Sequence, residues 1–115
     1  MVIDPMELAR EAAQAAEDKK GLDVLILDIT QISTVADYFV LSTGNSSTQV
    51  KAIADHVEEK LTEAGIKPLR REGVREGRWI LLDYGDVVVH VFQQEDRAYY
   101  NLERLWGDAQ VVNYE

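Results

Sequence analysis

Two segments, residues 79–84 and 87–93, constrain the fold more than any other part of the sequence. Both consist mostly of β-branched, aliphatic and aromatic residues, and Gly85-Asp86 separates them. Two residues of this kind between apolar segments are typical of a tight β-hairpin. If they form the turn, Tyr84 pairs with Val87, and the register of the whole hairpin follows. A slip of one residue would exchange its two faces.

One predicted face of this hairpin is almost purely aliphatic. Because side chains alternate along a strand, six residues share it: Ile80, Leu82, Tyr84, Val87, Val89 and Val91. We expect this face to lie beneath helices.

The opposite face mixes large apolar, polar and acidic side chains. It holds Trp79, Leu81, Asp83, Val88, His90 and Phe92. A buried core rarely contains an Asp and a His without partners, and a solvated face rarely contains a Trp, a Leu and a Phe. This composition favours a protein-binding surface. The alternative is a second core layer that the C-terminal segment covers.

Helix signals stand on both sides of two earlier apolar segments. Asp4 as N-cap, Pro5 and Glu7 predict a helix with a capping box that runs to Lys20, with Gly21 as a left-handed stop. Residues 22–28 and 38–42 are predicted strands, and residues 30–37 a turn-like connection between them.

A second helix is predicted over residues 47–64. Ser46 and Gln49 form its capping box, one face is apolar at helical spacing, and Gly65 and Pro68 end it. Residues 67–78 are basic and predict a short strand and a loop. Residues 96–109 are helical in character, with Leu102, Leu105 and Trp106 on one side. The order predicts an α/β fold, a mixed β-sheet with flanking helices, in one domain over residues 1–115.

Charge restricts the class of partner. Twelve basic and twenty-one acidic residues give a net charge of −9, which disfavours direct binding to nucleic acid and suits a basic protein partner, although acidity also serves solubility. The chain contains no cysteine and no apolar run near the roughly 20 residues that span a bilayer. Asp4 stands where a signal peptide would carry a basic residue. We therefore expect a cytoplasmic protein.

The loop from Ser42 to Ser47 is the clearest candidate for chemistry. It resembles the glycine-serine loop of nucleotidyltransferases, which hold metal ions with two carboxylates on the next strand. A helix follows here, Asp55 stands alone, and no Asp-x-Asp strand appears. Helix capping explains the loop, so we predict no catalytic residue and no cofactor.

No metal site is predicted elsewhere. Asp83 and Asp86 are too few ligands, His90 has no second His or Cys nearby in sequence, and His56 is expected to be a solvated surface residue.

Three stretches resemble the signatures of the ribosomal silencing factor (Iojap-related) family. The first combines residues 36–47, ADYFVLSTGNSS, with residues 49–55, QVKAIAD. The second is Glu72-Gly73 followed by residues 79–92, WILLDYGDVVVHVF. The third is residues 97–106, RAYYNLERLW, with Asp108-Ala109. The resemblance extends over roughly residues 5 to 109, in the expected order.

The resemblance implies a fold and a function. Members of this family have a nucleotidyltransferase-like fold that lacks the catalytic carboxylates. They bind large-subunit ribosomal protein fourteen and block association of the two ribosomal subunits, which lowers translation when nutrients are limited. They are not enzymes, and are often homodimers in isolation.

Site residues follow from the two lines of argument together. We expect Trp79, Leu81 and Phe92 to be apolar anchors, with Asp83 and His90 supplying polar and charge complementarity. The third signature adds three further candidates: Tyr99, Tyr100 and Asn101. Competing hypotheses are a small nucleotidyltransferase-like enzyme, or a toxin–antitoxin or adaptor module with another basic protein partner.

Overall fold

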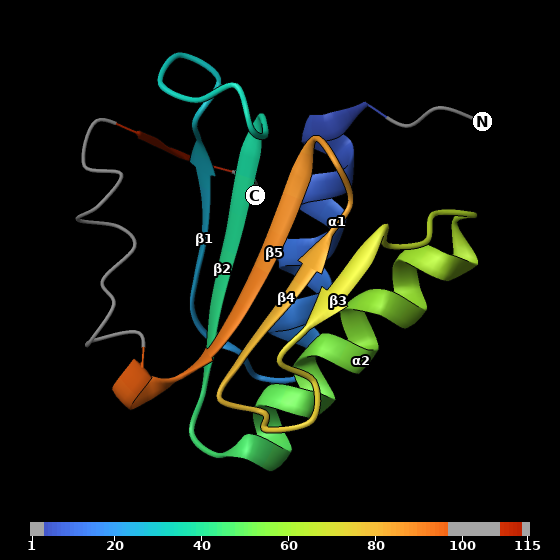
Figure 1. Ribbon diagram of the computed structural model, residues 1–115, viewed down its shortest axis with the longest axis vertical. Helices are drawn as coiled ribbons and strands as arrows, with labels where there is room; N and C mark the ends of the chain where they lie inside the picture. The colour runs from blue at the N-terminus through green and yellow to red at the C-terminus, as the bar shows by residue number, and fades with distance from the viewer. Residues whose placement is uncertain (1–3, 97–108, 114–115) are drawn as a thin grey trace.

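A mixed β-sheet with two long helices on one side forms the described part of the chain, residues 4–96 and 109–113 of the computed structural model (Figure 1). The strands lie in the order β3-β4-β5-β2-β1-β6. In chain order the elements are α1 (Pro5–Asp18), β1 (Leu22–Asp28), β2 (Tyr38–Gly44), α2 (Ser47–Glu63), β3 (Arg70–Glu72), β4 (Trp79–Asp83), β5 (Val87–Gln93) and β6 (Gln110–Val112).

Strand β5 lies inside the sheet between β2 and β4. It pairs with β2 in parallel and with β4 in an antiparallel arrangement, and the other pairs of neighbouring strands are antiparallel. The predicted mixed α/β fold is therefore confirmed. None of the helices in the described ranges has the length and apolar composition needed to cross a membrane.

The hairpin of β4 and β5 has the predicted register. Trp79 lies opposite Phe92, Leu81 opposite His90, and Asp83 opposite Val88. The Tyr84 N–H donates to the Val87 carbonyl at 2.9 Å, which closes the turn at Gly85-Asp86. Gly85 has a φ of +88°, a conformation that glycine adopts without steric cost.

The aliphatic face of this hairpin packs beneath both helices, as predicted. Its six side chains join α1, α2, Ile26 and Val40 in one buried cluster. On α1, four alanines with no exposed surface allow the helix to lie close to the sheet and to α2: Ala9, Ala12, Ala13 and Ala16.

Of the two predicted capping boxes, the one at α2 is confirmed in its main feature. The Ser46 hydroxyl accepts from the Gln49 N–H at 3.1 Å, and the Gln49 amide oxygen accepts from the Asn45 N–H at 2.7 Å. The capping box at α1 is wrong. Asp4 is the N-cap but makes no side-chain cap hydrogen bond, and the Glu7 carboxylate instead pairs with Arg10, one turn along, at 2.9 Å.

The predicted role of Gly21 is also wrong. Lys20, with a φ of +61°, is the left-handed residue after α1. Gly21 is required for a different reason, because a Cβ there would overlap the Ser42 hydroxyl and lie 2.9 Å from the Ala16 carbonyl oxygen. The absence of a side chain lets the end of α1 approach β2.

Two further differences concern the ends of strands. The second strand extends to Gly44, beyond the predicted residue 42, and β6 was not predicted. Gln110 to Val112 pair with Asp28 to Ile26 at the edge of the sheet. The helix predicted over residues 96–109 falls mainly on residues 97–108, which lie outside the described residues.

Gly73 offers a test of close packing beside β4. Gly73 and Gly65 both have positive φ, +76° and +83°. A Cβ at Gly65 would meet nothing within 4 Å, whereas one at Gly73 would overlap the Trp79 carbonyl oxygen. We expect G65A to lower the free energy of unfolding by about 1 kcal/mol and G73A by about 3 kcal/mol. Urea denaturation measures both, and equal losses would contradict the assigned contact.

Candidate protein-binding site

The six residues of the mixed hairpin face share one side of the sheet, as the register predicts. They are Trp79, Leu81 and Asp83 on β4, and Val88, His90 and Phe92 on β5. We call this set the hairpin face. It lies on the side of the sheet opposite the two helices, toward the viewer in Figure 1.

Burial divides the hairpin face along its length. The three β5 residues are buried, with 0% of Phe92, 5% of His90 and 7% of Val88 exposed. The three β4 residues are partly exposed. Strand β4 has only the three-residue edge strand β3 beyond it, whereas β5 has β4 on one side and three strands on the other. We call Trp79, Leu81 and Asp83 the β4 strip, since they carry the accessible surface.

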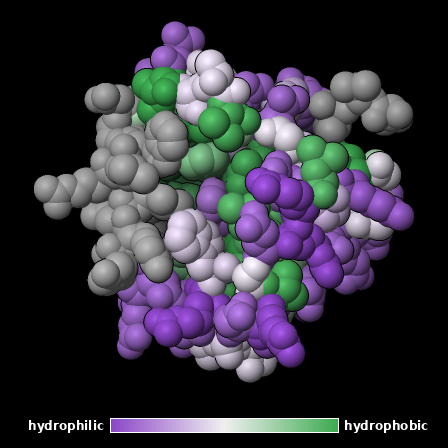
Figure 2. Space-filling view, in the orientation of Figure 1, coloured by the Kyte–Doolittle hydropathy of each residue, from purple (hydrophilic) through white to green (hydrophobic). Residues whose placement is uncertain are grey.

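An apolar cluster lies beneath and beside the β4 strip. Phe92 and Val88 belong to it, together with Leu27, Ile29, Ala36, Phe39 and Leu41, and Trp79 and Leu81 pack against it. The burial of the β5 half agrees with the alternative of a second core layer, whereas the C-terminal segment expected to cover it lies mainly outside the described residues. In Figure 2, hydrophobic surface is visible in the middle of this side, bordered by hydrophilic residues on the side of β3 and β4.

Four rings form a connected group at the Trp79 end of the strip. Ring centroids lie 5.0 Å apart for Trp79 and Phe92, 5.9 Å for His90 and Phe92, and 4.8 Å for Phe39 and His90. The Trp79 indole Nε1–H donates to His90 Nδ1 at 3.0 Å. Such contacts orient rings relative to one another, so Trp79 is not a loosely held surface side chain.

His90 is neutral in this setting. Burial lowers the pKa of His90 to about 4, from the 6.5 of an exposed histidine. Its Nδ1 accepts the indole hydrogen bond, because Trp can only donate, and Nε2 therefore carries the proton. In the structure His90 therefore orients the Trp79 ring and adds little accessible surface of its own.

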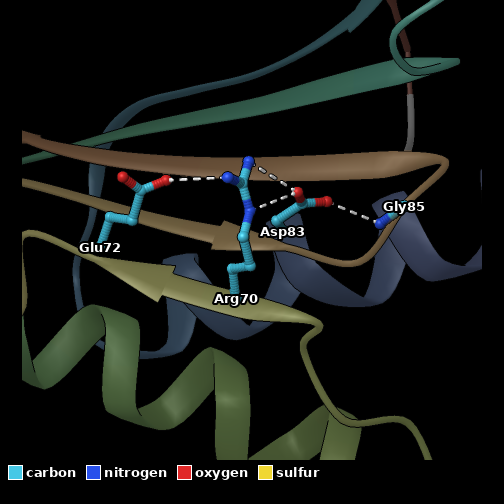
Figure 3. Close-up of polar contacts among 4 residues, drawn as sticks. All are labelled: Arg70, Glu72, Asp83 and Gly85. Carbon is cyan, nitrogen blue, oxygen red and sulfur yellow. Dashed lines mark hydrogen bonds and ion pairs between the residues drawn. The ribbon is translucent and has the colours of Figure 1, made fainter.

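Asp83 lies at the other end of the strip, where its carboxylate accepts hydrogen bonds from Arg70 and Gly85 (Figure 3). Arg70 on β3 donates to Asp83 Oδ2 from Nε at 3.3 Å and from Nη2 at 3.1 Å. Asp83 Oδ1 accepts from the Gly85 N–H at 2.8 Å. Arg70 Nη1 also lies 3.8 Å from Glu72 Oε2. Two carboxylates share one guanidinium, so this end of the strip remains acidic.

Sequence reasoning missed Arg70 as part of the site. The β3–β4 register places Arg70 directly opposite Asp83, but a three-residue strand gives no register signal in the sequence. It also missed the pair of Arg78 and Asp96 beyond the Trp79 end. There the Arg78 Nε and Nη2 donate to the two carboxylate oxygens of Asp96 at 3.2 and 3.1 Å. Asp96 is 8% exposed.

The other sequence candidates lie away from the strip. The Ser42 to Ser47 loop caps α2, as predicted. The prediction that His56 is a solvated surface residue is confirmed in part: the side chain is 17% exposed, but its Nε2 lies 3.2 Å from Asp18 Oδ2. Across residues 4–96 and 109–113, no group of three or more His, Cys, Asp or Glu side chains is arranged to hold a metal ion.

Three predicted binding residues, Tyr99, Tyr100 and Asn101, lie outside the described residues and stay predictions.

Comparison with known proteins establishes the family. Residues 3–115 match the family described as "Ribosomal silencing factor during starvation". The chain belongs to this family. It is 51% identical over 104 residues to ribosomal silencing factor RsfS of Bacillus subtilis, a match that spans 90% of this chain and 88% of the relative. The chloroplastic protein Iojap of Zea mays is 32% identical, over 90% of this chain and 45% of the relative.

Solved structures agree with this assignment. A protein of Chromobacterium violaceum is 42% identical with a TM-score of 0.89, and the match spans 91% of this chain and 88% of that one. A protein of Bacillus halodurans is 46% identical with a TM-score of 0.82, over 93% of this chain and 97% of that one. The resemblance to ribosomal silencing factors is confirmed. The nucleotidyltransferase-like detail of the fold stays a prediction.

Asp83 has two structural partners in this silencing factor, and substitutions separate them. Arg70→Ala removes an ion pair whose guanidinium side is 65% exposed, so we expect a loss below about 0.5 kcal/mol in the free energy of unfolding. Asp83→Ala also leaves the Gly85 N–H at the turn without its acceptor, and we expect a loss of about 1 to 2 kcal/mol. Urea denaturation at pH 7 measures both. Equal losses would show that the hydrogen bond to the turn contributes nothing.

The buried His90 makes stability depend on pH in a defined direction. The pKa of His90 is about 4 in the folded protein and 6.5 in the reference state, so the unfolded chain takes up the proton first as pH falls. The contribution of His90 to the free energy of unfolding is therefore fully present well above pH 6.5 and is lost as the pH falls from 6.5 toward 4. Between pH 7 and pH 5 the wild type should lose roughly 2 kcal/mol more than H90F, measured by urea denaturation. Parallel pH profiles would contradict a buried, neutral His90.

Proposed function

We propose that this protein binds large-subunit ribosomal protein fourteen through the β4 strip, and so silences translation by blocking the association of the large and small ribosomal subunits. The observation that carries the proposal is the β4 strip itself. It consists of the partly exposed Trp79 and Leu81 over a packed aromatic group, with the acidic end at Asp83 beside them. Membership in the family of ribosomal silencing factors during starvation supports the ribosome as the target.

The composition of the strip favours a protein over RNA as the direct contact. The chain carries a net charge of −9, which repels a phosphate backbone. An indole and a leucine side chain supply apolar area, and tryptophan is among the residues that contribute most to protein–protein affinity. The acidic end of the strip, with Asp83 and Glu72 around Arg70, suits a basic ribosomal protein.

Asp83 can serve such a partner although Arg70 already pairs with it. The ion pair is exposed on the Arg70 side, so it contributes little to stability and is exchanged at small cost. Glu72 lies 3.8 Å from the same guanidinium and offers Arg70 a second acceptor. A cationic side chain of the partner thus competes for Asp83 with the weak ion pair to Arg70. We therefore expect Asp83 to select for a positively charged partner and to add little to the affinity.

The mechanism is steric and requires no reaction. The described fold has principal extents of 33 × 32 × 26 Å. Subunit contacts require heavy atoms within about 4 Å of one another. A body of this size on the joining surface of the large subunit therefore prevents those contacts in its neighbourhood, and the helices on the far side of the sheet face away from the docked surface. The degree of silencing then depends on the fraction of large subunits that carry the bound protein.

Trp79→Ala tests the anchor. We expect the substitution to weaken binding to large ribosomal subunits by on the order of 2 kcal/mol, about 30-fold in Kd, because it removes the largest accessible apolar side chain of the β4 strip. The partly exposed position predicts a retained fold. Co-sedimentation with purified large subunits measures the affinity. Glu59→Ala, an exposed residue of α2 on the opposite side of the sheet, is the matched control and should bind like wild type.

The silencing step is measured separately. Light scattering follows association of purified large and small subunits, which the wild-type protein should reduce and the folded W79A protein should not reduce at the same concentration. Binding to isolated large-subunit ribosomal protein fourteen should show the same loss. A folded W79A protein that binds and silences like wild type would refute the β4 strip as the docking surface.

A further inference from the structure

We propose that His90 is a positioning residue for docking: its Nδ1 fixes the Trp79 indole in the orientation that the partner receives, before the partner arrives. The inference deepens the proposed function and rests on Trp79 as the anchor. Sequence analysis expected His90 to meet the partner itself. Since only 5% of His90 is exposed, its effect on a partner is exerted through Trp79.

The Trp79 side chain is held at its polar and its apolar parts. The indole Nε1–H donates to His90 Nδ1 at 3.0 Å, and the ring lies against Phe92 with centroids 5.0 Å apart and planes inclined by 34°. The contact with Phe92 is apolar, and an apolar contact by itself does not select where the N–H of an indole points. The hydrogen bond to His90 selects one orientation, because an indole has a single donor at a single place on its rim.

The base of this arrangement is rigid. The His90 ring stacks on Phe92 with planes inclined by 9° and meets Phe39 edge to face at 4.8 Å between centroids. Phe92 and His90 lie on β5, which is paired on both sides, with β2 and β4. The position of Trp79 is thus fixed by residues of the inner strand β5, and the edge strand β3 does not set it. An anchor ordered in advance costs less conformational entropy on binding.

His90 also leaves a buried polar atom without a hydrogen-bond partner in the described part of the chain, which an apolar residue at this position would avoid. With Nδ1 accepting from Trp79, the proton is on Nε2, which is buried and has no hydrogen-bond partner among the described residues. An unsatisfied buried donor is unfavourable. A phenylalanine of similar shape would fit among these rings without that cost but would offer no acceptor to Trp79. The acceptor is what a histidine adds at this position.

Three substitutions of His90 separate the effect of the hydrogen-bond acceptor for Trp79 from the effect of the ring shape. H90F keeps a ring and removes the acceptor. H90N places an amide oxygen near the position of Nδ1 and removes the ring. H90Q places its amide near the position of Nε2, too far along the side chain to meet the indole. If H90F does not fold, H90Q takes its place as the variant without an acceptor for Trp79.

The first readout is the orientation of the indole in the free protein. The chain has two tryptophans, so W106F leaves Trp79 as the single source of an indole N–H signal in a ¹⁵N-correlated NMR spectrum. We expect H90F and H90Q to move and broaden that signal at pH 7, and H90N to return it toward the wild-type position. An unchanged signal in a folded H90F protein would overturn the proposal.

The second readout is affinity for purified large ribosomal subunits at pH 7, with stability measured alongside. H90F should bind about three- to tenfold more weakly than wild type, the size of the entropy cost of ordering one side chain, and be at least as stable. H90N should recover affinity although it is less stable. If affinity instead falls in step with stability, so that H90N binds most weakly, the positioning role of His90 is refuted.

Failure of the proposed function looks different. If W79A binds large subunits like wild type while H90F still alters the indole signal, then His90 positions Trp79 but Trp79 does not dock. If W79A binds weakly while H90F and H90Q bind like wild type, the docking surface holds and the positioning role of His90 is refuted.

Discussion

Side chains on β5 face either the helices or the hairpin face, and in this protein both directions lead into packed clusters. Val87, Val89 and Val91 enter the cluster beneath α1 and α2, whereas Val88 and Phe92 enter the cluster on the other side of the sheet. The pairing of β5 with β2 and β4 fixes which residue faces which way. A slip by one residue would bury Trp79 and Asp83 beneath the helices and expose Ile80 and Leu82. The two-residue turn at Gly85 therefore determines both the core and the site.

The site lies where complete burial ends. Strand β4 has the same alternation as β5 but only the short β3 beyond it, so its outward side chains remain partly exposed. Trp79 and Leu81 pack against the apolar cluster and remain partly exposed, so as candidate binding residues they are already ordered. The acidic end depends on the same edge, because β3 brings Arg70 and Glu72 to Asp83.

Local sequence signals predicted the features that depend on local geometry. The Gly85-Asp86 turn gave the hairpin register, and Ser46 with Gln49 gave the start of α2. The differences from these predictions arise where the deciding contact is distant in sequence. His56 pairs with Asp18, 38 residues away, and Gly21 must be small because Ser42 lies against it. Short strands such as β6 contain too few residues to show an alternating pattern, so their pairing could not be anticipated.

The same distinction separates the parts of the site that could be predicted from those that could not. Alternation along two strands is enough to group Trp79, Leu81 and Asp83 on one face, but it says nothing about which of them is covered. Burial of His90 depends on β2, which supplies Phe39 from about 50 residues earlier in the chain, and this burial turns a predicted contact residue into a neutral acceptor for an indole. In the steric mechanism proposed above, the protein acts only while bound, so its effect follows its dissociation constant. Under that proposal, a residue that orders Trp79 without touching the partner alters silencing as directly as a residue in the contact itself.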